Sequence, residues 1–566
     1  MKDYKLVLAE ILANVVEMKK EDIEDLIEVP TNKDMGDFSF PCFRFAKILK
    51  KSPNAIAAEF AKKIERPDFI EKIENVNAYI NFYLDKEELI KTVLDKVFDE
   101  KENYAIEQKK DKGNIVIDYS SPNIAKPFHI GHLRSTVIGN SLYRIFEAIG
   151  YKCISVNHLG DWGTQFGKLI VAYRLYSNKE EVENKGIEEL LRIYVKFHEE
   201  AKKDPSLENL ARENFTKMEQ GDEEALSLWK WFKEISLKEF ERVYDILGIK
   251  FDSLNGEAFY NDKMDAVIKE LDAKNLTKIS EGAKVVEIED MSPCLITKKD
   301  GSTLYATRDI TAALYRQNMY NFQKCIYVTA LAQNLHFAQF FKVIEKMGYK
   351  WAEDLVHVPF GMVSMENGSI STRNGNVLLL EELLTEAINK TKQIIKEKNP
   401  KLENKDKVAK EVGIGAIIFD DMYNNIIKDI HFSWEKVLNF DGETGPYVQY
   451  TYARANSVFC KSGMKIEDID NNIDVSKITD ELSMALIKEI GKFSDIIQEA
   501  AAKYEPSIIA RYVVNLAKSF NKFYHENSIL VDEPNLKKAR LSLVVGAMYS
   551  IKNALWLLGI KAPKQM

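Results

Sequence analysis

The sequence predicts an α/β protein in three parts: a small N-terminal α/β domain, a central domain on a parallel sheet, and a C-terminal helical bundle. The first observation is length, because 566 residues exceed one hydrophobic core and suggest about four units. The second is a strand–helix–strand pattern between residues 114 and 157, which is typical of a parallel sheet. The third is a series of helical runs from about residue 380 onward, which is typical of a bundle.

The N-terminal part is predicted to span residues 1–108 as a separate small domain. Apolar residues recur at helical spacing over 6–18 and 55–64, and residues 76–84 alternate as a strand does. Residues 101–113 are dense in charge, and we interpret them as a linker to the next domain.

The central domain is predicted to span 109–380, with one βαβ unit at its start. That unit consists of a strand at 114–119, a helix at 131–149 and a strand at 153–157. Further elements are expected as strands at 285–288, 295–297, 325–329 and 355–358, and as a helix at 335–347. We therefore expect one sheet that is split in the sequence and reassembles in space.

Two helical regions complete the predicted architecture. An insertion at about 175–255 is long and charged, and Trp229, Trp231 and Phe232 are expected to anchor its packing. A helical stem at 381–440 and a bundle at 441–566 follow the sheet. Their helical runs are expected at 380–396, 407–427, 443–460, 477–503, 506–525 and 537–558.

The composition is that of an ordinary globular protein, with 45% hydrophobic and 29% charged residues. No run of about 18 apolar residues occurs, so no membrane span is expected. The N-terminus mixes acids and bases from the start and does not resemble a signal or transit peptide. The net charge of −8 neither excludes nor supports a nucleic-acid partner, because binding depends on a local patch.

The five cysteines are scattered through the chain at Cys42, Cys153, Cys294, Cys325 and Cys460. None of them forms a Cys-x-x-Cys pair, so a zinc site is not expected. Their odd number and wide spacing favour reduced thiols that are mostly buried.

The most informative motif is His129-Ile-Gly-His132, at the predicted turn from a strand into a helix. A helix N-terminus presents unpaired N–H groups and a positive dipole end, which together bind phosphate, and glycine lets a ligand approach closely. The motif therefore indicates ATP chemistry, with His129 and His132 stabilising charge on a phosphate. Taken alone, the same residues also fit a helix cap and a packing histidine.

A longer stretch around this motif resembles the signature of the class I arginyl-tRNA synthetases. It reads Ser120-Ser-Pro-Asn-Ile-Ala-Lys-Pro-Phe-His-Ile-Gly-His-Leu-Arg-Ser-Thr136. Other stretches similar to that family are Asn157-His-Leu-Gly-Asp-Trp-Gly-Thr-Gln-Phe-Gly167, Leu304-Tyr-Ala-Thr-Arg-Asp309 and Gly445-Pro-Tyr-Val-Gln-Tyr-Thr-Tyr-Ala-Arg454. The resemblance runs from about residue 20 to the C-terminus.

This resemblance implies a Rossmann-like catalytic domain and an anticodon-binding C-terminal bundle. It implies an arginine–tRNA ligase, which converts L-arginine and ATP to arginyl-adenylate and passes the arginyl group to the 3′-terminal ribose of tRNA(Arg). Mg²⁺ is the expected metal, and activation is expected to require bound tRNA. A cytoplasmic monomer is expected, whose N-terminal domain touches the tRNA elbow through residues 32–40.

The resemblance also implies which residues bind arginine. A guanidinium carries five donors in a plane, so its pocket needs carboxylates with neutral acceptors around them. The residues carried over are Asp118, Asn123, Tyr305, Asp309 and Gln333. Asp118 and Asp309 would face the guanidinium, and Asn123 would bind the amino or carboxylate end. The family often has glutamate where this chain has Asp118, and on pattern alone Asp118 and Asp309 also fit a turn residue and a helix cap.

The predicted ATP site combines the motif with a later loop. Gly131, His129 and His132 come from the motif, and Ser371 and Arg373 come from the run at 369–374. That run resembles the Lys-Met-Ser-Lys-Ser-like loop of class I synthetases, but it has no lysine. Lys126, three residues before His129, is predicted to supply the missing catalytic cation, and Arg373 is the other candidate.

The predicted tRNA contacts lie on one helix. Tyr447, Tyr450, Tyr452 and Arg454 could offer stacking faces to anticodon bases. On pattern alone, the same aromatic residues also fit a packed core.

Two other classes of function stay open at this point. A small-molecule nucleotidyltransferase could use the same His-x-Gly-His turn, although it would not need the helical C-terminal domain. A catalytically silent RNA-binding paralogue would explain the missing loop lysines, but His129, His132, Asn123 and Asp309 are all present. Arginine-dependent pyrophosphate exchange, with and without tRNA, would separate the three.

Overall fold

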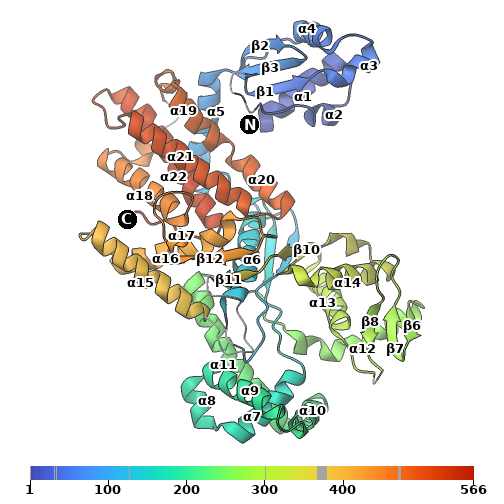
Figure 1. The fold of residues 1–566 in the computed structure, drawn as a ribbon. Helices are drawn as coiled ribbons and strands as arrows, with labels where there is room; N and C mark the ends of the chain where they lie inside the picture. Colours follow the sequence, from blue (N-terminus) through green and yellow to red (C-terminus); the bar gives the residue numbers. More distant parts are fainter. Residues whose placement is uncertain are drawn as a thin grey trace.

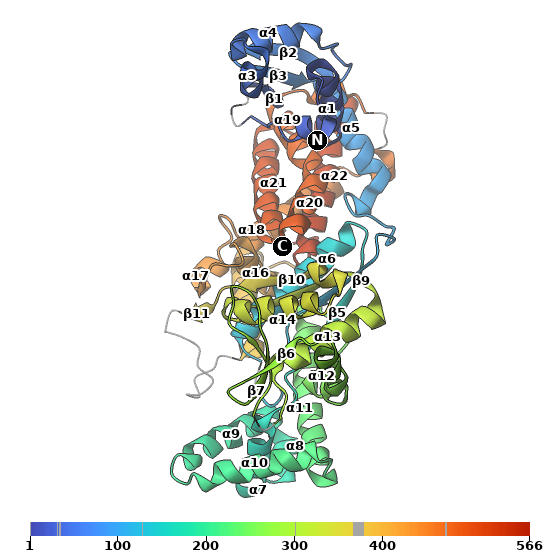
Figure 2. The same ribbon diagram turned by 90° about the vertical axis from the view of Figure 1, so that its right-hand side faces the viewer.

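The computed structural model describes residues 2–30, 32, 35–126, 128–299, 301–365, 379–469 and 473–566. The molecule is elongated, and its parts follow one another along the long axis (Figures 1 and 2). The N-terminal domain lies at one end, followed by the C-terminal helices and then the central sheet. The helical insertion lies at the opposite end.

The N-terminal domain is a three-stranded antiparallel sheet covered by helices. The strands are β1 (Phe38–Pro41), β2 (Ile70–Val76) and β3 (Tyr79–Leu84), in the order β1-β3-β2. The helices are α1 (Lys2–Val16), α2 (Lys20–Glu24), η2 (Phe43–Phe45), α3 (Ala46–Leu49) and α4 (Pro53–Lys63). The alternation predicted over 76–84 belongs to β3 only from Tyr79, because Asn77 takes φ +53° and turns the chain between β2 and β3.

The central sheet is parallel, as the βαβ unit predicted. Its strands are β4 (Asn114–Asp118), β5 (Lys152–Val156), β9 (Phe322–Ala330) and β10 (Leu355–Phe360), in the order β10-β9-β4-β5. Helix α6 (Ile130–Ala148) joins β4 to β5, and the turn η5 (Leu331–Gln333), α14 (Asn334–Lys346) and the turn η6 (Lys350–Asp354) join β9 to β10. Because the strands are parallel, the carboxyl ends of β4, β5 and β9 meet at one edge.

The prediction that all later strands rejoin this sheet is wrong for two of them. The runs at 285–288 and 295–297 form β7 (Ala283–Val286) and β8 (Cys294–Thr297), which join β6 (Thr277–Ser280) in a separate antiparallel sheet of order β6-β7-β8. Glu281 and Gly282 have φ +49° and +83° and close a tight hairpin between β6 and β7. A strand paired through a short hairpin is antiparallel to its neighbour, whereas a parallel partner requires a longer crossover.

The helical insertion is present and extends over five helices among the described residues. They are α7 (Thr164–Tyr176), α8 (Lys179–Lys185), α9 (Ile187–Ala201), α10 (Ser206–Glu219) and α11 (Glu223–Leu247). Phe232 is fully buried, and Trp229 and Trp231 pack against the same core, as predicted. The chain returns to the sheet through the turn η4 (Glu257–Lys263), α12 (Met264–Ala273) and, after β8, α13 (Tyr305–Tyr320).

The C-terminal part is helical, as predicted. Its elements are α15 (Leu380–Lys398), α16 (Lys405–Tyr423), α17 (Trp434–Val437), α18 (Gly445–Lys461), η8 (Ile466–Asp468), η9 (Val475–Ile478), α19 (Glu481–Gly491), α20 (Phe493–Lys503), α21 (Ser507–Glu526) and α22 (Pro534–Leu557). A parallel pair, β11 (Val363–Met365) with β12 (Ile430–Phe432), links this part to the central domain.

The run predicted over 477–503 is broken into two helices at Gly491. Helix α5 (Lys86–Glu100), which precedes the turn η3 (Lys101–Asn103), packs against α19 and α22. A Cβ on Gly491 would lie 2.9 Å from Cγ2 of Val93 on α5, so this close approach requires glycine. The break therefore marks the place where the N-terminal segment docks on the bundle.

Two simple expectations from composition can be compared with the structure. All five cysteines are free thiols, and Cys42, Cys153, Cys294 and Cys325 are buried, whereas Cys460 is exposed. Over the described ranges, no helix combines the length and the apolar character that crossing a membrane requires.

Candidate active site

The candidate site lies where β4, β5 and β9 end. Asp118 closes β4, and the segment from Tyr119 to His129 then crosses the edge of the sheet to the first turn of α6. Open parallel sheets bind ligands at this edge because the connecting loops leave the strands there. Asp118 and the histidine turn therefore both lie at this edge of the central sheet.

The two motif histidines cap helix α6. Nδ1 of His129 accepts a hydrogen bond from the backbone N–H of Gly131 at 3.0 Å, and Nδ1 of His132 accepts one from the N–H of His129 at 3.2 Å. The two rings lie 4.0 Å apart between centroids, and His132 stacks on Phe128. A neutral imidazole that accepts at Nδ1 carries its proton on Nε2. Both histidines therefore present an Nε2–H donor.

The surroundings keep both histidines neutral. Burial, with a smaller contribution from the charge of Lys126, lowers the pKa of His129 to about 4. Burial and the neighbouring His129 and Lys126 lower the pKa of His132 well below its usual range. The turn therefore combines neutral N–H donors with a nearby lysine ammonium, and this combination suits an anion such as a phosphate chain.

Gly131, which the motif suggests lets a ligand approach, also leaves room for the ring of His129. A Cβ at this position would lie 2.8 Å from Cε1 of His129. Glycine is thus required because the His129 ring folds back over the first turn of the helix. The space left by the missing side chain of Gly131 is occupied by the ring of His129.

Asp118 is engaged by other residues of the chain. Its Oδ2 lies 2.7 Å from Nη2 of Arg316, and its Oδ1 accepts a hydrogen bond from Ser121 Oγ at 3.0 Å. Asp118 and Arg316 are both buried. The Asp118 charge is therefore compensated within the protein before any ligand binds.

Asp309 is more accessible than Asp118 and belongs to a chain of polar groups. One carboxylate oxygen lies 2.5 Å from Nε2 of His336, and the other lies 4.0 Å from Nε2 of His158. Burial raises the pKa of Asp309, but the hydrogen bond and charge of His336, with the charges of His158 and Arg316, outweigh it and hold that pKa below its usual value. Asp309 is therefore a carboxylate that can face a cation.

The remaining residues predicted to bind arginine are Asn123, Tyr305 and Gln333. Asn123 pairs with Gly160, the residue that follows the end of β5 by four positions. Tyr305 lies one helical turn before Asp309 on α13 and is 67% exposed. Gln333 is exposed at the end of η5, three residues before His336. Tyr305 therefore lies on the same face of α13 as Asp309, and Gln333 precedes His336, a contact of Asp309, by three residues.

Ser371 and Arg373, the predicted loop contacts to ATP, lie outside the described residues. The chain resumes at Leu379, which bridges His129, and the N–H of Leu380 donates to the carbonyl of Phe128 at 2.8 Å. The base of α15 is therefore bonded directly to the histidine turn.

A cavity of about 730 Å³ adjoins Tyr305. Aromatic rings of Trp162, Phe215 and Tyr305 line it together with three cations (Arg212, Lys298 and Arg308) and two carboxylates (Glu219 and Asp265). Nε of Arg308 is buried and has no hydrogen-bond partner within the described part of the chain. Rings and cations in one cavity are the groups that bind an unpaired nucleotide.

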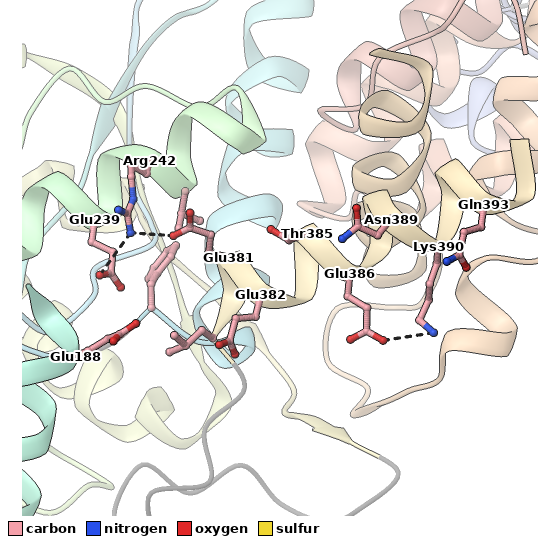
Figure 3. A pocket seen from close by; sticks show the side chains of 13 residues that line it. Glu188, Glu239, Arg242, Glu381, Glu382, Thr385, Glu386, Asn389, Lys390 and Gln393 are labelled. Carbon is pink, nitrogen blue, oxygen red and sulfur yellow. Dashed lines mark hydrogen bonds and ion pairs between the residues drawn. The ribbon is translucent and has the colours of Figure 1, made fainter. Parts of the chain in front are cut away.

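A second cavity, of about 700 Å³, is lined by Phe128 and lies between α11 and α15 (Figure 3). Its carboxylates are Glu188, Glu239, Glu381, Glu382 and Glu386. Arg242 bridges Glu381 at 3.0 Å and Glu239 at 3.9 Å, and burial raises the pKa of Glu239 to about 7. These five carboxylates would repel a phosphate chain. We therefore expect a phosphate chain to bind at the histidine turn and not in this cavity.

A third cavity, of about 450 Å³, contains the predicted tRNA contacts on α18. Tyr447, Tyr450 and Arg454 line it, together with Phe440 and Met566. Arg454 lies over the ring of Tyr450 at 4.9 Å and is 2.6 Å from Oδ1 of Asn521. Tyr450 is 42% exposed, whereas Tyr452 is 4% exposed and belongs to the core.

Three residues of the site were not predicted: His158, His336 and Arg316. His158 lies inside the Asn157-to-Gly167 stretch, which stands out in the sequence only for its similarity to the arginyl-tRNA synthetase family. His336 lies in the first turn of α14, and Arg316 lies seven residues after Asp309, on the same face of α13. The spacing of Arg316 could have been noticed, but nothing in the sequence indicates that it reaches Asp118.

Comparison with known proteins gives one consistent family. Residues 93–434 match the profile described as class I (R) tRNA synthetase catalytic domain, residues 2–84 an arginyl-tRNA synthetase N-terminal domain, and residues 448–566 a DALR anticodon binding domain. Proteins named arginine–tRNA ligase from Alkaliphilus metalliredigens and Clostridioides difficile are each 53% identical, covering 100% of both chains.

Solved structures agree at the level of the fold. The arginyl-tRNA synthetase of Thermus thermophilus superposes with a TM-score of 0.84 at 24% identity, covering 99% of both chains. The arginyl-tRNA synthetase of Plasmodium falciparum gives a TM-score of 0.81 at 28% identity, covering 99% of this chain and 98% of that one.

Proposed function

Because the chain belongs to the class I arginyl-tRNA synthetases and is an arginine–tRNA ligase, we propose that its reaction takes place at the carboxyl ends of β4, β5 and β9. In the first step, a carboxylate oxygen of arginine attacks the α-phosphorus of ATP, and the bond to the β-phosphate oxygen breaks to release pyrophosphate. In the second step, a hydroxyl of the terminal tRNA ribose attacks the arginyl carbonyl, AMP leaves, and the hydroxyl proton is released.

Asp309 is our candidate for the principal contact of the arginine guanidinium. The observation that carries this assignment is that Asp309 remains partly exposed and ionised, while both oxygens of Asp118 already contact Arg316 and Ser121. Tyr305 and Gln333 would complete the pocket around Asp309, and Asp118 would form its wall. Asn123, between Asp118 and the histidine turn, would bind the amino or carboxylate end of arginine.

The phosphates of ATP would lie against the first turn of α6. The Nε2–H groups of His129 and His132 would donate to phosphate oxygens, and Lys126 would add a positive charge where negative charge develops. Gly131 would shape this turn through the His129 ring, and Ser371 and Arg373 stay predictions. Within the described chain, no cluster of His, Cys, Asp or Glu could hold a metal ion. We therefore propose that Mg²⁺ enters bound to ATP, as part of the substrate.

Transfer RNA would contact both the central domain and the C-terminal bundle. The cavity beside Tyr305 would receive the terminal nucleotides, because the acceptor hydroxyl must reach the carboxyl carbon of bound arginine. The cavity on α18 would receive anticodon bases, with Tyr447, Tyr450 and Arg454 as contacts. The expected monomer stays a prediction, and work with tRNA in protein synthesis supports a cytoplasmic location.

Pyrophosphate exchange with arginine, measured with and without tRNA, tests this proposal. We expect exchange that depends on arginine and requires tRNA. Lys126→Ala should lower kcat of exchange far more than it raises KM for arginine, whereas Lys278→Ala, an exposed lysine on β6, should change neither.

Each failure of this experiment has a distinct meaning. Lack of exchange under every condition would favour a catalytically silent RNA-binding paralogue. Exchange with another carboxylic acid in place of arginine would favour a small-molecule nucleotidyltransferase. An unchanged exchange rate in Lys126→Ala would overturn only the role of that lysine.

A further inference from the structure

The segment between β4 and α6 has a strained backbone. Ser120, Ser121 and Ala125 take φ values of +73°, +48° and +61°, in the left-handed region that residues with side chains disfavour. Such backbone persists only where surrounding groups hold it, and it is concentrated at functional sites. The segment carries Asn123 and leads into Lys126, His129 and the first turn of α6.

Helix α11 of the insertion holds this segment along one stripe. Ser236, Phe240 and Tyr244 follow one another at intervals of four residues, and all three are buried. Ser236 Oγ accepts a hydrogen bond from the N–H of Ala125 at 3.0 Å. Phe240 and Tyr244 contact the ring of Phe128 at 5.5 and 5.4 Å between centroids. One helix of the insertion thus contacts strained Ala125 and also Phe128, the residue before His129.

The hydroxyl of Tyr244 lies between the ends of two strands. Its oxygen is 2.7 Å from Ser120 Oγ, after β4, and 2.9 Å from Nδ2 of Asn157, after β5. Asn157 Oδ1 accepts the N–H of strained Ser121 at 3.1 Å, and this bond fixes which end of the amide faces Tyr244. The amide Nδ2 can only donate, so the Tyr244 hydroxyl accepts from Asn157 and donates its own proton to Ser120.

The turn that contains Ser120 is also hydrogen-bonded to α6, the helix that begins at the histidine motif. Thr136 Oγ1 on α6 lies 2.9 Å from Ser120 Oγ and donates to the carbonyl of His132 at 2.7 Å. Ser135 Oγ accepts the N–H of Ser120 at 2.9 Å. Displacing Ser120 would therefore disturb both the arginine side and the histidine side of the site.

We propose that Tyr244 is a positioning residue for arginine activation, whose hydroxyl keeps the turn from Ser120 to Ala125 in its strained form. This inference rests on the roles proposed above for Asn123, Lys126 and the histidine turn. It makes the helical insertion a structural part of the active site, because without α11 the chain has no hydroxyl between Ser120 and Asn157.

Tyr244→Phe tests the role of the hydroxyl, because the ring contacts with Phe128 and Phe251 remain. We expect kcat of arginine-dependent pyrophosphate exchange to fall about tenfold, since the reacting groups lose alignment. KM for tRNA should stay within about twofold, because Tyr244 is buried and lines neither of the two cavities proposed for tRNA. Tyr512→Phe is the matched control, because it removes another buried hydroxyl, bonded to the Glu489 carbonyl at 3.0 Å in the bundle.

A double-mutant cycle separates positioning from general stability. Ser120→Ala removes the other end of the same hydrogen bond, so the double variant should be no slower than the slower single variant. If Tyr244→Phe fails to fold, as judged by its melting curve, Ser120→Ala carries the kinetic test alone, with the same expected fall in kcat.

Three outcomes would overturn the proposal. The first is a kcat of exchange for Tyr244→Phe that equals the kcat for Tyr512→Phe. The second is a fall in kcat for the double variant that equals the product of the two single-variant falls. The third is a crystal structure of Tyr244→Phe in which Ser120 and Ser121 keep positive φ, which decides the matter whatever the activity. If the unmodified chain lacks arginine-dependent exchange, the proposed function fails, and the crystal structure still tests the hydroxyl.

Discussion

His129 and His132 show how one turn of backbone can set the protonation of two side chains. Each Nδ1 accepts a backbone N–H, so each ring must carry its proton on Nε2 if it is neutral. Burial then makes the neutral form the stable one. A protonated pair 4.0 Å apart would also repel. The motif thus supplies hydrogen-bond donors that do not titrate near neutral pH.

We predict that both imidazoles stay neutral, with the proton on Nε2, between about pH 5 and 8. The pKa of His129 is lowered to about 4, so it gains a proton only when the pH falls below that value. Nitrogen-15 chemical shifts of the labelled protein measure this directly. A proton bound at Nδ1 at pH 7, or a midpoint near 6.5 for His129, would contradict the prediction. His129→Gln, which lacks the ring, identifies the resonance.

At the scale of elements, α13 brings opposite charges to the edge of the sheet. Asp309 and Arg316 are seven residues apart on one face, so one helix carries both the carboxylate that we propose for the arginine guanidinium and the cation that contacts Asp118. Nε and Nη1 of Arg316 are buried with no partner among the described residues. The Arg316 guanidinium in this pair therefore lacks some hydrogen-bond partners within that part of the chain. Removing one member of such a buried pair lowers stability strongly, whereas replacing both members by uncharged residues often changes stability little.

Arg316→Leu should destabilise the central domain by about 3–5 kcal/mol, because it leaves the Asp118 carboxylate buried without its partner. Arg316→Leu combined with Asp118→Asn should recover most of that loss. Lys185→Leu, which removes an exposed ion pair with Glu181, should cost far less, because exposed ion pairs contribute little to stability. Urea unfolding followed by tryptophan fluorescence measures all three. A double variant no more stable than Arg316→Leu would contradict this account of the pair.

For the whole molecule, the question is how the anticodon end is joined to the catalytic turn. Arg144 and Ser141 on α6 donate to the carbonyls of Trp556 and Leu557 at the end of α22. The last residues then run back along α18, where Gln449 Nε2 donates to the carbonyl of Lys561. The helix that begins at the histidine motif is thus bonded at its other end to the bundle that would hold the anticodon.

Tyr450→Ala should raise KM for tRNA by roughly 5- to 100-fold, because stacking of one base contributes about 1–3 kcal/mol. KM for arginine should not change, since the α18 cavity shares no residue with the catalytic site. Aminoacylation kinetics at varied tRNA and varied arginine separate the two constants. Tyr452→Phe, on the buried face of the same helix, is the control and should behave as the unmodified chain. Equal KM values for tRNA in the two variants would remove Tyr450 from the interface.

Short-range features of the fold were predictable because they depend on local spacing. The βαβ unit at 114–157 and the C-terminal helices follow from periodic apolar residues, and β4, α6 and β5 begin and end within a residue or two of the predicted bounds. The hairpin of β6 and β7 was missed, because a short apolar run does not reveal which strand it pairs with. The break at Gly491 was missed as well. The reason for glycine at this position is the close approach of Val93, which is far away in the sequence.

The sequence by itself determined the family, the reaction and the motif that carries them, because these depend on the identity and order of residues within short stretches. Only the tertiary structure decided that Arg316 neutralises Asp118, that His336 and His158 flank Asp309, and that Tyr244 holds Ser120. These contacts join residues more than 100 positions apart or lie between different elements. Sequence periodicity shows which face of an element is buried, whereas the partner on that face is chosen by how distant segments pack.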